Sequence, residues 1–530
     1  MLTWLKKLST LRRSGPDLNA SNFKKRADEH LGRDELDAAA MCYRRALSIN
    51  TEYVDACIGL GFVLLEQRQY GEAHGHLTHA LSLDPDIADV HYLLGRLCQE
   101  QDGAAGDAPI AHFTRALELK PDLEVAYRAL YFALAGRDQI EPAKALLSKA
   151  IAAFPASAEF QGYLGQLLDR EGRYDDAVAC YERALVLQPD AADLHYILGE
   201  THRKRGDLAA ASTSFRKALT LNPDLAAAHL SFGIVLEGQG KIDDAIGSYM
   251  RAVALNSEFT AAHHHLGNAY MQKSATRQAI SCFREVVRLE PQSGVAHLIE
   301  ALSGTSSERA PSGYVEKLFD EYADRFDSHL VHALKYSVPE QLAGLLQAHA
   351  WRNVEKWDVL DLGCGTGLAG VAISAYARQL VGVDLSAKML EKAAARNLYR
   401  RLERLDLIAM MKLEAANSYD VVIAADVLVY IGRLDELVDQ LRRLLRPQGL
   451  FAFSVESLDA LAGADSEIDM DRDFRLTQTG RYAHSADYLR AIALDQGFDV
   501  LKLIDAQGRV DKGRAVQHYL GLWRLSSMVV

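Results

Sequence analysis

The sequence predicts two architectures in series: an all-helical repeat array in the first half and an α/β domain with a largely parallel sheet in the second. Two observations lead to this prediction. Six prolines are spaced by 34 residues or a multiple of 34, apart from one step of 36: Pro85, Pro121, Pro155, Pro189, Pro223 and Pro291. From Asp358 onward, short apolar runs alternate with helical patterns, which is typical of strands joined by crossover helices.

Composition narrows the class of protein. At 530 residues the chain is long enough for several domains, and its formal net charge of −12 argues against broad nucleic-acid binding, so we expect no DNA partner. The six cysteines are scattered without a CxxC pair, which favours a reducing compartment. No run of about 18 apolar residues occurs. We therefore expect no transmembrane segment and a cytoplasmic location.

The start of the chain is treated as a separate N-terminal segment, residues 1–19. Its first part is short, basic and weakly amphipathic, without the apolar core and cleavage site of a signal peptide. A frayed terminus is the simplest interpretation, and contact with a membrane surface is the alternative.

Each repeat unit is expected to form two amphipathic helices. The first helix carries a Leu-Gly or Phe-Gly pair, as at Leu164-Gly165, where glycine permits close approach of the partner helix. The second carries residues such as Ala177, Tyr181 and Ala184, one turn apart on one face, and a proline follows it. We expect about eight units and a capping helix over residues 20–302. The third and fourth units are the least regular.

This pattern resembles the tetratricopeptide repeat. The resemblance implies a superhelix whose concave groove binds a protein or peptide. The alternative is an array that only packs against the rest of the chain or forms a dimer, and the oligomeric state stays open. The paired His76 and His79 and the run at residues 263–265 lack a third ligand at metal-binding spacing. We therefore expect no metal site.

Two segments are expected between the repeats and the α/β core. Residues 303–313 are rich in Ser, Thr, Gly and Pro and predict an interdomain linker. In residues 314–350, Tyr314, Leu318, Tyr322 and Phe326 recur at steps of four, which marks one face of a helix. This segment is predicted to be a helical cap over a cofactor site, or a docking helix between domains.

The core, residues 351–530, begins with a strand, a glycine-rich turn and a helix. The run Asp361-Leu-Gly-Cys-Gly-Thr-Gly367 follows an apolar segment, and the next apolar segment ends at Asp384. Glycines at a strand-to-helix turn allow tight backbone angles and close approach of a ligand, while free amides of the helix can hold a carboxylate. An acid about twenty residues further on can bind both ribose hydroxyls. Ser386 is expected to cap the helix that follows.

Three features favour a methyl-donor loop over a dinucleotide loop. The spacing is GxGxG with an acid, Asp361, before the first glycine; Asp406 lies near a third strand; and residues 498–505 and 515–524 predict a final antiparallel pair of strands. Together they resemble class I S-adenosylmethionine-dependent methyltransferases. The resemblance implies a Rossmann-like, seven-stranded sheet with an antiparallel last strand. The whole chain resembles bacterial methyltransferases that carry tetratricopeptide repeats.

The resemblance also implies roles for individual residues toward S-adenosyl-L-methionine. Glycines of the loop line the methionine part, Asp361 lies near its ammonium group, the second strand supplies the ribose site, and the third supplies the adenine site. A further acid follows the fourth strand, where cofactor and substrate meet. The cofactor-binding residues implied in this way are Asp361, Gly363, Gly365, Gly367, Asp384, Leu385, Asp406, Leu407 and Asp426.

Candidates for the chemical step are fewer. Tyr430 ends the segment after the fourth strand, and His484 is a candidate general base in an irregular stretch that also contains Arg481. The alternative is that Ser485 caps the next helix and His484 packs against that helix. His518 and Glu456 are weaker candidates, and transfer to a good nucleophile needs no base.

Three functional hypotheses follow. The main one is a methyltransferase whose repeats recruit or orient a protein partner or substrate. The second is a small-molecule or glycan methyltransferase whose repeats serve assembly. The third is a scaffold whose methyltransferase fold binds cofactor without turnover. The motif after the fourth strand is not the Asn/Asp-Pro-Pro-Tyr type, and no Pro-Cys nucleophile occurs, which argues against methylation of nucleic-acid bases.

Overall fold

The computed structural model describes residues 18–102, 106–305, 307–328, 336–349, 356–462, 473–511 and 514–526. Most of the N-terminal segment 1–19, including its basic stretch, lies outside these residues. Contacts divide the chain into two compact units, Met1–Gly240 and Lys241–Val530. The division falls after Gly240, within the segment that is predicted to hold the repeats.

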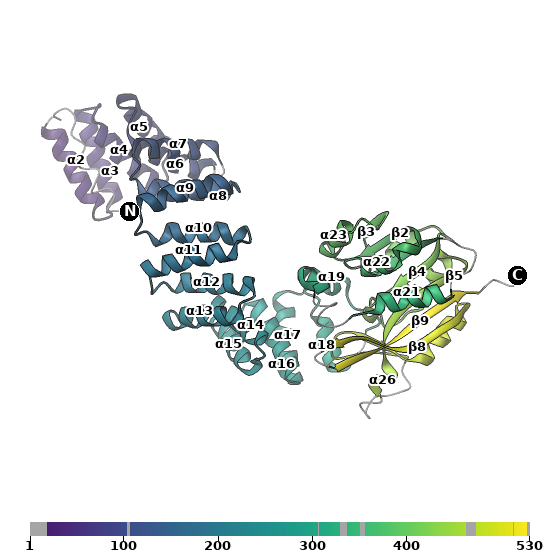
Figure 1. Cartoon of the computed structure of the whole chain (residues 1–530). Coiled ribbons are helices and arrows are strands. Elements are labelled where there is room, and N and C mark those ends of the chain that lie inside the picture. The colour runs from purple at the N-terminus through teal and green to yellow at the C-terminus, as the bar shows by residue number, and fades with distance from the viewer. Residues whose placement is uncertain are drawn as a thin grey trace. The chain divides into compact units, whose positions relative to one another are not determined.

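The first unit is all helical. Each helix packs against the next along the chain, as the stacked ribbons of Figure 1 show. Its helices are α2 (Leu18–Leu31), α3 (Leu36–Ile49), α4 (Val54–Glu66), α5 (Tyr70–Leu83), α6 (Ala88–Asp102), α7 (Asp107–Leu119), α8 (Glu124–Gly136), α9 (Ile140–Ala153), α10 (Ala158–Arg170), α11 (Tyr174–Leu187), α12 (Ala192–Arg205), α13 (Leu208–Leu221) and α14 (Ala226–Gly238).

The second unit begins with α15 (Ile242–Leu255), α16 (Thr260–Gln272), α17 (Thr276–Leu289) and α18 (Ala296–Ser303). In chain order, α2 to α17 are sixteen described helices and α18 follows them. The count of about eight repeats with a capping helix stays a prediction. Across the described residues, no helix combines the length and the apolar character needed to cross a bilayer.

The recurring glycines lie where the two helices of a pair come closest. A Cβ placed on Gly95 would lie 2.5 Å from the Phe113 ring, and one on Gly199 would lie 2.7 Å from the Phe215 ring. Real Cβ atoms do not approach so closely, so each aromatic side chain fills the space that the missing side chain leaves. The periodic glycine and the aromatic residue of the second helix therefore form one packing unit.

The α/β domain alternates helices and strands as predicted. Its helices are α19 (Ser312–Tyr322), η2 (Ala323–Arg325), α20 (Phe326–Ser328), α21 (Val338–His349), α22 (Leu368–Ile373), η4 (Ser374–Tyr376), α23 (Ala387–Ala395), α24 (Leu407–Leu413), η5 (Leu428–Tyr430), α25 (Asp435–Leu444), α26 (Leu458–Ala462) and α27 (Ala486–Asp495). Its strands are β1 (Trp357–Leu362), β2 (Ala377–Asp384), β3 (Arg401–Arg404), β4 (Tyr419–Ala424), β5 (Leu445–Ser457), β6 (Phe474–Leu476), β7 (Tyr482–His484), β8 (Phe498–Asp511) and β9 (Arg514–Leu525).

The strands form one mixed sheet (Figure 1). Strands β3, β2, β1, β4 and β5 are parallel neighbours, β9 pairs antiparallel with β5, and β8 pairs antiparallel with β9. These seven strands match the predicted fold, including the antiparallel pair at the end. The sheet has nine strands in all, because β6 and β7 are also joined to it through β5. The sequence between β5 and α27 gave no strand pattern long enough to predict them.

Both faces of the sheet are covered. Val359 and Val421 pack with α21 and α22 on one face, whereas Leu360 and Val422 pack with α24, α25 and α27 on the other. Successive residues of a strand point to opposite faces, so a strand buried on both sides is apolar at every position. In a parallel sheet of this kind, the carboxyl ends of the strands meet at one edge, where ligands bind.

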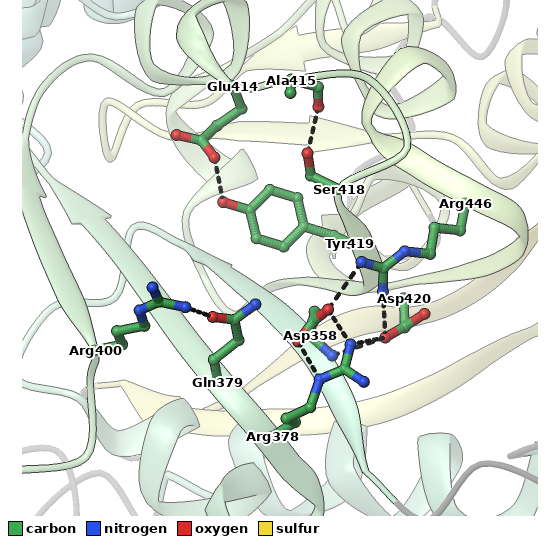
Figure 2. Close-up of polar contacts among 10 residues, drawn as sticks. All are labelled: Asp358, Arg378, Gln379, Arg400, Glu414, Ala415, Ser418, Tyr419, Asp420 and Arg446. Atoms are coloured by element: carbon green, nitrogen blue, oxygen red, sulfur yellow. Dashed lines mark hydrogen bonds and ion pairs between the residues drawn. The ribbon is translucent and has the colours of Figure 1, made fainter.

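A charge cluster closes the opposite, amino end of β1 (Figure 2). The carboxylate of Asp358 is 2% exposed and pairs with Arg378 and with Arg446, whose Nη2 lies 2.8 Å away. Arg446 also reaches Asp420 at 2.7 Å. The hydrogen bond from Arg378, with that from Arg446, lowers the pKa of Asp358 to about 2 despite its burial. The cluster stabilises the sheet away from the candidate site.

We expect Asp358→Asn to lower the free energy of unfolding at pH 7 by about 2 kcal/mol. This loss is smaller than that for breaking a fully buried ion pair, because Arg378 is 58% exposed. A depressed folded-state pKa stabilises the fold above the unfolded pKa of about 4, and this contribution is lost as the pH falls toward 2. Urea unfolding at pH 7 and pH 3 should therefore show the difference shrinking at acid pH. Asp439→Asn, at an exposed position of α25, is the control. An equal effect of both variants would contradict the prediction.

Candidate functional site

A cavity of about 520 Å³ opens at the carboxyl edge of the sheet. Its lining comes from the loop after β1, the end of β2, the segment 425–431 after β4, helices α19 and α20, and the side chains of Arg481 and Arg509. The sequence predictions are therefore brought together in one place, although their residues come from distant parts of the chain.

The glycine loop requires its glycines. Gly363, Gly365 and Gly367 have φ values of +64°, +52° and +88°, a region that other residues rarely adopt. A Cβ on Gly363 would also lie 2.4 Å from Val427 Cγ2. Gly363 and Gly365 line the cavity, whereas Gly367 lies outside the lining and starts α22.

Asp361, on β1 just before this loop, is a buried carboxyl group outside the cavity lining. Tyr399 donates a hydrogen bond of 2.6 Å to Oδ2, whereas Oδ1 is buried without a hydrogen-bond partner among the described residues. Burial raises the pKa of Asp361 to about 7, and the Tyr399 hydrogen bond offsets only part of that effect. A buried acceptor without a donor is unfavourable by roughly 1–3 kcal/mol, so this atom is suited to a cationic ligand group.

Asp384 is held by backbone amides at the rim of the cavity. The N–H groups of Gly365 and Ser386 donate to its two oxygens, each at 2.9 Å. Burial raises the pKa of Asp384, and these amides oppose the effect. Leu385 lines the cavity beside it. Ser386 Oγ accepts from Met389 N–H at 3.1 Å, which confirms the predicted cap of α23.

Asp406 is already engaged. Its Oδ1 caps α24 by accepting the N–H groups of Ile408 and Ala409 at 3.0 and 3.3 Å, and its Oδ2 forms an ion pair with Arg309. Leu407 lines the cavity, whereas Asp406 lies outside the lining. The adenine contact through the Asp406 carboxylate stays a prediction, and the structure shows this carboxylate already holding a helix and a cation.

Asp426 anchors a buried charge network at the floor of the cavity. Its oxygens meet Ser454 Oγ at 2.9 Å, Arg509 Nη1 at 3.0 Å and His518 Nε2 at 3.2 Å. Arg509 also reaches Glu456 Oε1 at 2.5 Å. Burial alone would raise the pKa of Asp426, but hydrogen bonds and charges from these partners hold it well below its usual range.

Sequence reasoning missed the cation at the centre of this network. Asp426 was named as a cofactor residue, with Glu456 and His518 as weaker candidates, but Arg509 was not named at all. Arg509 lies on β8 and reaches the site only because β8 pairs with β9 and β9 with β5. Asp426 also has φ +55°, a strained value for a residue other than glycine and typical of functional turns.

His484 is not brought to the cavity. Its side chain is fully buried, Nε2 lies 2.9 Å from the Gly432 carbonyl oxygen, and the ring stacks on Tyr488. Burial lowers the pKa of His484 to about 4. Ser485 caps α27 by accepting Tyr488 N–H. The alternative interpretation is thus confirmed, and the catalytic assignment of His484 is withdrawn because its ring is sealed from the cavity.

Tyr430 and Arg481 do reach the cavity. Tyr430 is 6% exposed and packs edge-on against Phe319 of α19. Arg481 precedes β7 and lies 3.7 Å from Glu456. The tentative place of Tyr430 near the reacting groups is therefore compatible with the geometry.

The segment predicted as a linker forms part of the wall. Residues 307–310 hydrogen-bond along residues 430–433: Ala310 N–H donates to Tyr430 O at 3.0 Å, and Gly432 N–H donates to Glu308 O at 2.8 Å. Arg309 and Ala310 line the cavity. The Ser- and Gly-rich composition suggested a free linker, but these backbone hydrogen bonds fix the segment on the site.

Helices α19 and α20 cover the cofactor loop through acidic side chains. Asp320 accepts from Ser386 Oγ at 2.5 Å, and Asp327 pairs with Arg396 at 2.6 Å and with the Thr366 hydroxyl. Their apolar residues, among them Phe319, face the cavity. The predicted cap is therefore positioned over the loop and shields it from water.

Comparisons with known proteins agree with both halves of the chain. A family model described as a methyltransferase domain matches residues 360–451. Models of the tetratricopeptide repeat match residues 30–97, 133–179, 164–226, 238–274 and 260–293. The two sets of matches fall in the segments that the sequence assigned to the core and to the repeats.

Among curated proteins, the chain is similar to the malonyl-[acyl-carrier protein] O-methyltransferase of Methylovorus sp. (strain MP688), with 38% identity over 157 residues that cover 28% of this chain and 51% of the relative. It is also similar to the ubiquinone biosynthesis O-methyltransferase of Rickettsia akari (strain Hartford), with 24% identity over 37% of this chain and 77% of the relative. The chain spans about half the length of the first of these. Among solved structures, it resembles YrrB, described as a TPR protein with an unusual peptide-binding site, at 23% identity over 35% of this chain and 95% of that chain, with a TM-score of 0.31.

Proposed function

Because the chain carries tetratricopeptide repeats followed by a methyltransferase domain, a domain type that uses S-adenosyl-L-methionine as methyl donor, we propose that it transfers a methyl group from this donor to an acceptor that the repeats recruit or orient. The observation that carries the proposal is the buried Asp361 Oδ1, just before the glycine loop, which lacks a hydrogen-bond donor among the described residues.

The residues in and beside the cavity fit the donor. The unpartnered oxygen of Asp361 would accept from the ammonium group of the methionine part, and the amide-held carboxylate of Asp384 would accept from the ribose hydroxyls. Glycine at positions 363 and 365 leaves room for the ligand. A side chain at Gly363 would have no space, and both positions have a positive φ that other residues rarely adopt. Leu407 would pack against the adenine.

The residues of the chain supply position and a dry environment. A bound sulfonium donor supplies the methyl group for direct displacement by the acceptor. Tyr430 and the network around Asp426 form the floor on which the acceptor would lie, while α19 and α20 exclude water. Catalysis of this kind depends mainly on placing two reactants in line, with little proton transfer.

The repeats are proposed to bind a protein partner. Matches to tetratricopeptide models across residues 30–293 support this role, because arrays of this type form extended concave binding surfaces. A transfer assay with labelled donor in cell lysate tests the role. We expect label in the protein fraction. If this label disappears when the first six helix pairs are added as a separate competitor, recruitment of the acceptor by the repeats is supported. Label found only in small molecules would favour repeats that serve assembly.

Calorimetric titration of the full chain with S-adenosyl-L-methionine is the primary test of the proposed activity. We expect one site per chain and competition by S-adenosylhomocysteine. Absence of binding by the wild-type chain would overturn the proposal. Binding without transfer of label to any fraction of the lysate would favour the scaffold hypothesis instead.

Binding of the donor should depend on pH because of Asp361. The donor ammonium favours the charged carboxylate, whose pKa is raised to about 7 before binding, so affinity should fall about tenfold between pH 8 and pH 6. Titrations at pH 6 in phosphate and in imidazole buffers should reveal release of about one proton. Asp361→Asn should bind more weakly at every pH and lose this dependence. A wild-type affinity that is constant from pH 6 to pH 8 would contradict the assignment.

A further inference from the structure

The turn before β7 presents a cation to the cavity. Thr477 N–H donates to Arg481 O at 2.8 Å and Gly480 N–H donates to Thr477 O at 2.9 Å, which closes the turn. His297 of α18, only 1% exposed, places Nε2 3.0 Å from the Gly480 carbonyl oxygen. The last helix of the repeat array therefore holds the backbone of Gly480, and the neighbouring Arg481 side chain lines the cavity.

The guanidinium of Arg481 keeps capacity for a ligand. It has five N–H donors, and its side chain is 29% exposed. Its carboxylate neighbour is Glu456, and the 3.7 Å between them is longer than a hydrogen bond. Arg509 already binds Glu456 at 2.5 Å. Asp426 is likewise bound by Arg509. The phenol of Tyr430 also hydrogen-bonds to Arg481. One phenol and one carboxylate at 3.7 Å do not use all five donors, so the guanidinium can still bind a ligand.

The rest of the acceptor side combines apolar residues with tyrosines, among them Tyr336 and Tyr430. Burial raises the pKa of the Tyr336 phenol well above its usual value, so this phenol keeps its proton near pH 7. No histidine, glutamate or lysine occurs among the described residues that line the cavity, and its two aspartates are engaged, Asp384 by amides and Asp426 by Arg509. A neutral alcohol or ammonium acceptor must lose a proton to react. A carboxylic acid has lost it already above about pH 4–5, so it needs no base.

We propose that the methyl acceptor is a carboxylate on an apolar group, bound by Arg481, and that the product is a methyl ester. This inference rests on the proposed methyltransferase activity. A lone pair of the carboxylate oxygen forms the new O–CH3 bond while the S–CH3 bond of the sulfonium donor breaks and its electron pair goes to sulfur. The products are a neutral ester and a neutral thioether, and no proton is transferred.

Three probes of matched length test the acceptor class. The full chain is incubated with methyl-labelled S-adenosyl-L-methionine and octanoate, 1-octanol or octylamine. We expect label only with octanoate, and we expect base treatment to release it as volatile methanol, since esters are cleaved by base and ethers and methylamines are not. The same base treatment of labelled lysate, separated into protein and small-molecule fractions, shows whether the carboxylate belongs to a protein or a small acid.

Variants of Arg481 separate acceptor binding from donor binding. Arg481→Gln should lower kcat/KM for octanoate about 100-fold, the order expected when one partner of a buried hydrogen-bonded charge pair is removed, while the Kd for S-adenosyl-L-methionine stays unchanged. Arg481→Lys should lie between, since it keeps the charge without the bidentate geometry. Arg490→Gln, on α27 and 56% exposed, is the matched control. Unchanged donor affinity also shows that the variant is folded.

Two results would overturn the acceptor assignment and leave the proposed activity intact: label that is stable to base in every fraction, or an Arg481→Gln variant with wild-type kcat/KM. Failure of the wild-type chain to bind S-adenosyl-L-methionine would overturn both the activity and the acceptor assignment.

Discussion

Replacing Asp384 by alanine should weaken binding of S-adenosyl-L-methionine by about 100-fold or more. The variant removes two hydrogen bonds from ligand hydroxyls to a charged carboxylate, each worth about 1.5–3 kcal/mol. It also leaves the N–H groups of Gly365 and Ser386, which now donate to Asp384 at 2.9 Å, without their partner. Calorimetric titration with the donor and with S-adenosylhomocysteine measures the loss, which should be similar for both ligands because both carry the ribose.

Two further variants make this test specific. Asp384→Asn keeps one acceptor oxygen for the loop amides and should bind better than Asp384→Ala. Asp495→Ala, at the exposed end of α27, removes the same charge far from the loop and should bind as the wild type does. Wild-type affinity in Asp384→Ala would mean that the ribose lies elsewhere.

The parts of this site that the sequence predicted are those fixed by local chemistry. The three loop glycines adopt positive φ values that only their residue type permits easily. Ser386 caps the helix that follows it directly. The repeats could be predicted equally well from the sequence, because each glycine and its aromatic partner lie within one helix pair, as in Gly199 and Phe215.

The parts that the sequence did not predict depend on pairing over long distances. Arg509 reaches Asp426 across 83 positions of chain, and its place follows from the register of β8, β9 and β5. His484 was named as a base because its residue type suits that role, but its burial follows from packing on Tyr488. The composition of residues 307–310 predicts a linker, because backbone hydrogen bonds such as those to residues 430–433 do not depend on the type of side chain.

The largest effect on stability is expected at Arg509. This side chain is 5% exposed and binds Asp426 at 3.0 Å and Glu456 at 2.5 Å. Arg509→Met would leave two carboxylates in a buried site with weaker partners. Asp426 would keep His518 and Ser454, and Glu456 would keep Arg481 at 3.7 Å. Removal of one partner from a buried ion pair typically destabilises by about 3–5 kcal/mol. We expect a loss of that size in the free energy of unfolding of the α/β domain.

Urea unfolding followed by tryptophan fluorescence measures this loss, since the indole of Trp523 is fully buried against Phe453 and Phe498 in the same domain. Arg524→Met on β9, whose exposed ion pair with Asp499 is 3.0 Å long, is the control and should lose at most about 1 kcal/mol. The double variant Arg509→Met with Glu456→Gln should recover part of the stability, because it removes one of the two unpaired charges. If Glu456→Gln gave no recovery, the cause would be lost packing of the arginine side chain rather than unpaired charge. The network would then serve mainly to fill the floor of the cavity.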